Sequence, residues 1–252
     1  MLHKMLRYKE TNWKFKKGFR IRKYILDIDK IHASNTLAEQ QAKIKKLSLV
    51  AFLNKEQRKI FVNICKRLKH NESDFYQNKN LHVTLFGFGP LAKKDHEPIM
   101  KKIHQYVQQN RIKKLNIKFD SVRPGTEYSQ VKTQRPLQKI SNGTVIAYGL
   151  VNQNMDFFNY TNKLGQFLLN DKKIKSILGA NFRKKFPSVW CTLGYYRRKK
   201  DFEIDNDLEQ IFSQYRDLTN SDLFNFSFSE ISLVVSNYKN LRYPKLIQKF
   251  CL

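Results

Sequence analysis

From residue 47 to the C-terminus, short apolar runs of strand length alternate with amphipathic stretches of helical length, which limits the folds open to this chain. Strands are expected at 47–54, 81–88, 115–122, 144–151, 189–196 and 243–252, with one or two more within 224–236. Helices are expected at 55–69, 95–110, 155–170 and 207–218. The order β-α-β-α-β-β-α-β-α-β-β predicts a mixed α/β or α+β domain rather than a helix bundle.

Two short signals predict turns between these elements. The sequence RPGT at 123–126 is typical of a turn that ends a strand. Asn142 and Gly143 form a dipeptide that favours a tight β-hairpin.

The chain is strongly basic. Its 252 residues include 48 Lys and Arg against 21 Asp and Glu, for a formal net charge of +27. A field of this sign favours a polyanionic partner, so RNA or DNA is expected first and an anionic membrane surface second. A Lys- and Asn-rich composition inherited from an AT-rich genome would give the same charge without any such partner.

Residues 1–46 are interpreted as a basic N-terminal extension of a domain at 47–252. The extension is poor in acids and carries scattered aromatic residues, and a helix is expected at 35–46. This composition is typical of an organelle-targeting segment, of an arm that binds RNA and of a solvated extension, and all three alternatives stay open. No apolar run approaches the roughly 18 residues of a membrane span, so a soluble protein without a membrane partner is expected.

The spacing of the three cysteines indicates the kind of compartment in which the protein is found. Cys65, Cys191 and Cys251 are widely spaced and match neither a zinc-binding pattern nor a disulfide framework. This usage fits an intracellular, reducing compartment, and the mitochondrial matrix and the cytoplasm both stay open. We expect no metal and no cofactor.

Two strands carry a threonine in the same setting, within the sequences HVTL at 82–85 and WCTL at 190–193. Successive side chains of a strand point to opposite faces, so His82 and Thr84 share one face, and Trp190 and Thr192 share another. If the two halves of the domain pair around a pseudo-twofold axis, these two faces line one cleft.

The HVTL sequence resembles the H-x-T-h signature of the 2H phosphoesterase superfamily, which includes 2′-5′ RNA ligase-like proteins and RNA 2′,3′-cyclic phosphodiesterases. The order of elements over 47–252 and the run ISLVVSNYKNLRYPKLIQKF at 231–250 resemble that family too. The resemblance implies a two-lobed α+β fold with pseudo-twofold symmetry, in which antiparallel sheets form a central cleft and helices lie outside. It also implies metal-independent acid–base chemistry by two histidines, with threonine hydroxyls on the phosphate.

The chain departs from this pattern at one decisive place, because Trp190 stands where the second histidine belongs. An indole N–H donates a hydrogen bond but does not shuttle a proton near neutral pH. All six histidines lie at or before residue 104, so none nearby replaces it. Loss of one proton-transfer group costs about 10²–10⁴-fold in rate. The remaining candidate catalytic residues are His82, Thr84 and Thr192.

Several residues near the second motif are suited to hold RNA. The expected binding residues are Trp190, Arg183, Lys184, Lys185, Tyr195, Tyr196, Arg197 and Arg198. An indole can stack on a base, which is worth about 1–3 kcal/mol, and the basic residues suit a phosphate backbone. The structural alternative is that the threonines are ordinary strand residues, that Trp190 packs, and that the charges are solvated.

The sequence therefore predicts an RNA-binding protein of the 2H phosphoesterase fold with lost or impaired catalysis. Such a protein could be a structural component of an RNA–protein particle such as an organellar ribosome, in contact with ribosomal RNA and neighbouring proteins. The alternative is an active RNA 2′,3′-cyclic or 2′-5′ phosphodiesterase that uses His82.

Overall fold

The structure is a computed structural model of the 252-residue chain. It describes residues 25–26, 45–67, 74–75, 80–128, 139–150, 152–179, 189–195, 214–215, 218, 221–237 and 244–252.

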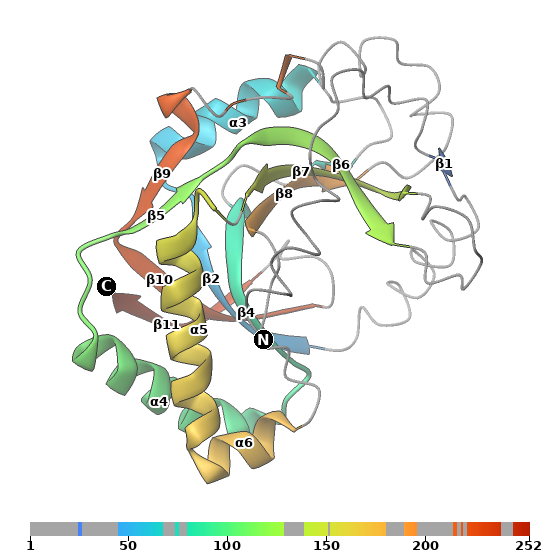
Figure 1. The fold of residues 1–252 in the computed structure, drawn as a ribbon. Helices are drawn as coiled ribbons and strands as arrows, with labels where there is room; N and C mark the ends of the chain where they lie inside the picture. The colour runs from blue at the N-terminus through green and yellow to red at the C-terminus, as the bar shows by residue number, and fades with distance from the viewer. Residues whose placement is uncertain are drawn as a thin grey trace, which may run out of the picture.

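One large sheet organises the molecule (Figure 1). Its hydrogen-bonded order is β1 (Ile25–Leu26), β7 (Lys139–Gly149), β8 (Val189–Tyr195), β4 (His82–Gly89), β2 (Lys45–Phe52), β10 (Glu230–Asn237) and β11 (Lys245–Cys251). Off this path, β3 (Asp74–Phe75) pairs with β8, and β6 (Ser121–Tyr128) pairs with β7. These pairs are antiparallel except β1 with β7, which is parallel. A second, two-stranded antiparallel sheet joins β5 (Leu115–Lys118) to β9 (Asn225–Phe228).

Helices cover this sheet on its apolar side. They are α3 (Lys55–Arg67), α4 (His96–Gln109), α5 (Met155–Asn170) and α6 (Lys172–Leu178), with short 3-10 turns η4 (Lys93–Asp95) and η5 (Asp222–Phe224). No described helix is long and apolar enough to cross a membrane. The α+β class with antiparallel sheets is confirmed, and three of the expected helices occur at the predicted places.

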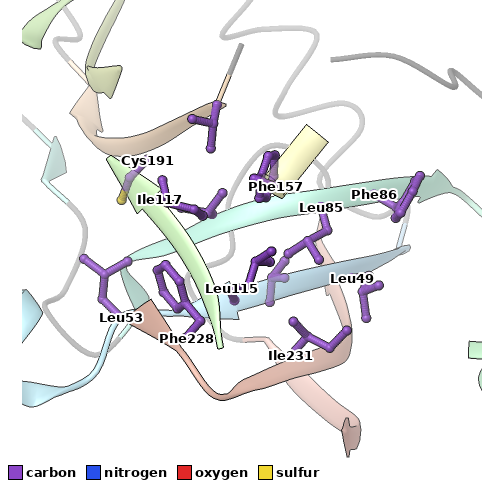
Figure 2. Packing of buried hydrophobic residues seen from close by; sticks show 14 of the residues in the cluster. Leu49, Leu53, Leu85, Phe86, Leu115, Ile117, Phe157, Cys191, Phe228 and Ile231 are labelled. Carbon is purple, nitrogen blue, oxygen red and sulfur yellow. The ribbon is translucent and has the colours of Figure 1, made fainter. Parts of the chain in front are cut away.

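The core forms because alternate residues of the sheet strands are apolar. In β2 the inward positions Leu47, Leu49 and Ala51 are almost fully buried. Helix α3 contributes Phe61, whose ring contacts three further phenylalanines at centroid distances of 5.3–6.0 Å, namely Phe119, Phe224 and Phe226. Figure 2 shows side chains of several strands and of α5 packed in one common core, including Leu85 of β4 and Phe157 of α5. The prediction that the phenylalanines at 224, 226 and 228 are core residues is confirmed.

Both predicted turns are wrong. The RPGT segment lies inside β6, which stays paired with β7 on both sides of it: Pro124 lies opposite Val145, and Thr126 lies opposite Ser141. Between these pairs β7 holds two residues more than β6, so Asn142 and Gly143 belong to a bulge rather than a hairpin. Pairing with a neighbouring strand overrides the local turn preference of both dipeptides.

The observed ends of the other helices and strands differ less from those predicted. Residues 45–46, expected at the end of a helix, begin β2 instead. Helix α6 was not predicted; it begins where the Asp171 side chain accepts a hydrogen bond from the Ile174 N–H at 3.1 Å. The expected helix at 207–218 and the rest of the extension at 1–44 fall outside the described residues, apart from 214–215, 218 and the two residues of β1.

Candidate functional site

The two threonine-bearing strands are direct neighbours in the large sheet. Strands β4 and β8 run antiparallel, with Val83 paired to Cys191. An antiparallel register then sets His82 opposite Thr192 and Thr84 opposite Trp190. We call the surface formed by these last four residues the His82 face.

The adjoining strands continue the same surface on both sides. The pairs are Phe52 with His82, Val50 with Thr84, Ile146 with Thr192 and Tyr148 with Trp190. Directly opposed residues project to one side of a sheet, so these side chains surround the His82 face. Val83 and Cys191 point into the core and are fully buried. The structure thus brings together the four residues that the sequence analysis placed on two shared faces.

His82 is held in one orientation. Its Nδ1 lies 2.8 Å from the backbone carbonyl oxygen of Asn80, and its ring meets Phe52 edge-on at a centroid distance of 6.0 Å. A carbonyl oxygen only accepts hydrogen bonds, so Nδ1 carries the proton of the neutral ring and Nε2 carries the lone pair. The residue is only 8% exposed.

Burial sets the protonation of His82. Removal of the imidazolium from water lowers the pKa of His82 to about 4, and the Asn80 carbonyl, which favours the charged ring, offsets only part of this effect. His82 is therefore neutral at pH 7, when Nε2 can accept a proton but has none to donate. It suits a general base or a hydrogen-bond acceptor, and it does not suit a general acid.

The other three residues of the His82 face are partly exposed. The hydroxyls of Thr84 and Thr192 can donate hydrogen bonds to phosphate oxygens. Trp190 lies beside Tyr148, which is buried, so the indole has a neighbouring ring on β7 and a partly open surface. This is an arrangement that can hold a phosphate and an aromatic base together.

Neither of the two buried cysteines is a reactive thiolate. Cys191 lies between Trp190 and Thr192 in sequence, but burial raises its pKa above the ordinary range of a thiol. Burial likewise raises the pKa of Cys65 to about 12. Both side chains remain thiols at neutral pH and are poor nucleophiles. The described residues contain no group of three His, Cys, Asp or Glu side chains that could hold a metal ion.

The predicted basic residues around the second motif cannot be placed against this face. Six of the expected binding residues lie outside the described part of the chain: Arg183, Lys184, Lys185, Tyr196, Arg197 and Arg198. The backbone of Tyr195 pairs with Asp74 and Thr144, and its side chain is not described. Their roles stay predictions.

The sequence analysis missed three contributors to the site, namely Asn80, Phe52 and Tyr148. Phe52 and Tyr148 lie in stretches correctly predicted as strands, but only the strand register places them beside His82 and Trp190. Asn80 acts through its backbone carbonyl, which any residue type supplies, so no sequence signal could have found it.

The buried neutral imidazole predicts that stability falls in mild acid. A histidine of the unfolded chain has a pKa near 6.5, whereas the pKa of folded His82 is about 4. Between these two values the unfolded chain binds more protons than the folded protein, so the free energy of unfolding decreases as the pH falls. The loss reaches about 3 kcal/mol at pH values near 4 and disappears above pH values near 6.5.

Urea denaturation at a series of pH values tests this expectation. His82→Gln removes the titrating group and should make the free energy of unfolding less steep with pH over this window. His104→Gln removes an exposed histidine of α4 and should leave the wild-type steepness. Equal pH dependence in the wild type and His82→Gln would contradict the assignment.

No family model matches the chain, and no curated protein sequence matches it. Solved structures similar to it include one described as a phosphoesterase, at 12% identity over 82% of this chain and 98% of that chain, with a TM-score of 0.49. The apo form of Escherichia coli LigT is 12% identical over 83% of this chain and 98% of that chain, with a TM-score of 0.46. Usb1 of Kluyveromyces marxianus is 11% identical over 84% of this chain and all of that chain, with a TM-score of 0.44.

Proposed function

We propose that this chain is a 2H phosphoesterase-like protein that binds RNA ends at the His82 face, with catalysis lost or strongly impaired. The observation that carries the proposal is the pairing of β4 with β8. A local twofold axis through the pair Val83 and Cys191 exchanges Thr84 with Thr192, and it exchanges His82 with Trp190.

The phosphate-holding half of such a site is complete. Two threonine hydroxyls occupy equivalent positions on the paired strands, and the hydrogen bond from Nδ1 of His82 to the Asn80 carbonyl makes Nε2 the acceptor nitrogen of the ring. Hydrogen bonds from neutral hydroxyls to an anionic phosphate are charge-assisted and stronger than bonds between neutral groups. The site can therefore bind a phosphate without performing chemistry on it.

The proton-transfer half is incomplete. Cleavage of a phosphodiester requires a base for the attacking oxygen and an acid for the leaving oxygen. His82 is neutral at pH 7 and serves only the first role, and the indole of Trp190 serves neither. The missing acid lowers the rate about 10²–10⁴-fold, which makes binding the better supported function.

RNA is the ligand class that fits both the charge and the aromatic residue. A formal net charge of +27 favours a polyanion, and Trp190 can stack on an unpaired base beside the threonines. A protein that binds RNA without turning it over suits a structural role in an RNA–protein particle such as an organellar ribosome. Stable co-migration of the full-length protein with such a particle is expected, and recovery as a free monomer would contradict this role.

An active RNA 2′,3′-cyclic or 2′-5′ phosphodiesterase is the second candidate. It is favoured by the fixed tautomer of His82, in which Nε2 carries the lone pair that a general base uses. A further residue of this chain would then have to act as the acid.

Replacement of Trp190 tests the binding site. Trp190→Ala should weaken binding of a short single-stranded RNA by about 5–150-fold, which corresponds to the loss of one stacked base of about 1–3 kcal/mol. Trp190→Phe keeps a stacking ring and should retain most of the affinity. The fluorescence anisotropy of a dye-labelled RNA measures the affinity of the wild type and of both variants, so the readout does not depend on the indole that the variants lack. Unchanged affinity in Trp190→Ala would overturn the proposed site.

A further inference from the structure

A basic surface lies where α4 and α6 meet. Its six members are exposed lysines, which we call the lysine corner: Lys93, Lys94, Lys101, Lys172, Lys173 and Lys175. Lys102 of α4 reaches Asp171 at the start of α6, with a distance of 3.4 Å between Nζ and Oδ2. The pKa of Glu97 of α4 is lowered mainly by its hydrogen bond and ion pair with Lys101, and the charge of Lys173 of α6 adds to this effect. Helices α4 and α6 therefore come close to each other (Figure 1).

Positive charge dominates at this corner. Six exposed lysines stand against three acidic residues, Asp95, Glu97 and Asp171. Two of these acids are already engaged: Glu97 with Lys101 at 2.8 Å, and Asp171 with the Ile174 N–H at 3.1 Å. Glu97 offsets the charge of Lys101, and the other five lysines still outnumber Asp95 and Asp171, so the corner attracts anions.

The corner is held firmly enough to present a defined surface. The Lys102 ammonium, besides its contact with Asp171, lies 4.6 Å from the centre of the Phe167 ring of α5. Ile174 and Leu178 anchor α6 by burying their side chains in the core. Helices α4 and α6 thus place four of the six lysines, and Lys93 and Lys94 lie in the η4 turn that leads into α4.

The lysine corner and the His82 face lie on opposite sides of the large sheet. His104 of α4 contacts Phe250, with 6.2 Å between ring centroids, and Phe250 pairs with Ile231 on the core side. Ser232, which follows Ile231 in β10, pairs with Val50, and Val50 pairs with Thr84 of the His82 face. Since adjacent strand residues face opposite ways, α4 covers the side of the sheet that the His82 face does not.

We propose that the lysine corner is a second RNA-docking surface, which holds the sugar–phosphate backbone without reading sequence or chain ends. The proposal rests on RNA being the ligand of this protein. Lysine ammonium groups are point charges that suit phosphates in any orientation. A membrane surface fits less well, because an interfacial helix needs exposed apolar residues and the large exposed apolar residues of the described chain, Met155, Leu223 and Leu246, lie outside α4 and α6.

Two RNA-binding surfaces on opposite sides of one sheet have a structural consequence. A single short RNA strand cannot contact both at once, whereas a protein lodged between two RNA segments contacts one with each side. The lysine corner thus gives the protein the means to join RNA segments within a particle.

The salt dependence of binding to an RNA hairpin without a cyclic phosphate tests the corner. The triple variant Lys172→Gln, Lys173→Gln and Lys175→Gln should weaken binding about tenfold or more, and each lost phosphate contact should lower the slope of log K against log salt by roughly 0.7–0.9. The matched control Lys55→Gln, Lys59→Gln and Lys66→Gln removes the same charge from exposed positions of α3 and should change affinity less than about threefold.

The outcomes separate this proposal from the function of the His82 face. Equal losses in both triple variants would show that only the overall charge matters, which overturns the corner but leaves the His82 face standing. Trp190→Ala should weaken hairpin binding less than the α6 variant does, and a loss equal to that of the α6 variant would also overturn a separate surface. If the wild type binds neither hairpin nor single-stranded RNA, both proposals fail together.

Discussion

Trp190→His is expected to raise hydrolysis of an RNA 2′,3′-cyclic phosphate by about 10²–10⁴-fold over the wild type. The substitution places an imidazole at the position that the local twofold axis relates to His82, beside Thr84. At this partly exposed position the new ring can be protonated near neutral pH and can act as the missing acid. His82, with its pKa of about 4, remains available as the base.

Three controls decide whether the gain comes from paired histidines. Trp190→Gln removes the indole without supplying a titrating group and should show no gain. His82→Ala in the Trp190→His background should return the rate to the wild-type level. The pH–rate profile of Trp190→His should be bell-shaped, since one group must be neutral while the other is protonated. A variant that folds, binds RNA and stays inactive would show that the two strands do not reproduce a catalytic pair.

Gly149→Ala is expected to destabilise the protein by about 3 kcal/mol or more. A Cβ at Gly149 would press against the backbone carbonyl oxygen of Lys118, and it would lie 2.6 Å from Val189 Cγ1 and 2.8 Å from Asn154 Nδ2. Such contacts are far inside van der Waals range, and the carbonyl belongs to a paired strand that cannot easily move.

The hydrogen bonds at this point make the substitution more costly. The Asn154 side chain accepts from the Lys118 N–H at 2.7 Å and donates to the carbonyls of Lys118 at 2.9 Å and Leu150 at 2.8 Å. It thereby ties β5 to the end of β7, and Asn154 is buried, so broken bonds would leave unsatisfied polar groups. Gly149 also pairs with Val189, the neighbour of Trp190, so the strain would reach the His82 face.

Thermal or urea unfolding measures this effect. Gly87→Ala is the matched control, because Gly87 is an exposed strand residue at which an added Cβ meets nothing within 4 Å. It should change the free energy of unfolding by less than about 1 kcal/mol. Similar losses in both variants would show that the crowding at Gly149 is relieved by a small backbone shift.

Much of the fold could be predicted because its strands and helices carry clear periodicity. The period-two pattern of LHVTLFGF placed β4, and α5 was predicted with its observed bounds. Strand partners were harder to predict, since the register of β4 against β8 depends on contacts between residues more than a hundred positions apart. Helix α6 was missed because it is only 7 residues long, although Asp171 before it is a typical capping residue.

The shared faces of the candidate residues were predicted from the sequence, and their electrostatics were not. Residue types alone placed His82 with Thr84 and Trp190 with Thr192. They could not indicate that burial would hold His82 neutral or that the Asn80 carbonyl would fix its tautomer, because both effects depend on tertiary packing. A histidine with its ordinary pKa can serve as acid or as base near neutral pH, whereas burial leaves His82 only the role of base.

The most direct test of the central claim follows binding and cleavage of one substrate in the same experiment. Wild-type protein in excess is mixed with a short RNA that ends in a 2′,3′-cyclic phosphate, with His82→Ala alongside. The proposal predicts a saturable complex in which the cyclic phosphate stays intact over many times the lifetime of the complex. Turnover by the wild type that disappears in His82→Ala would contradict it and would show that the chain is an active phosphodiesterase.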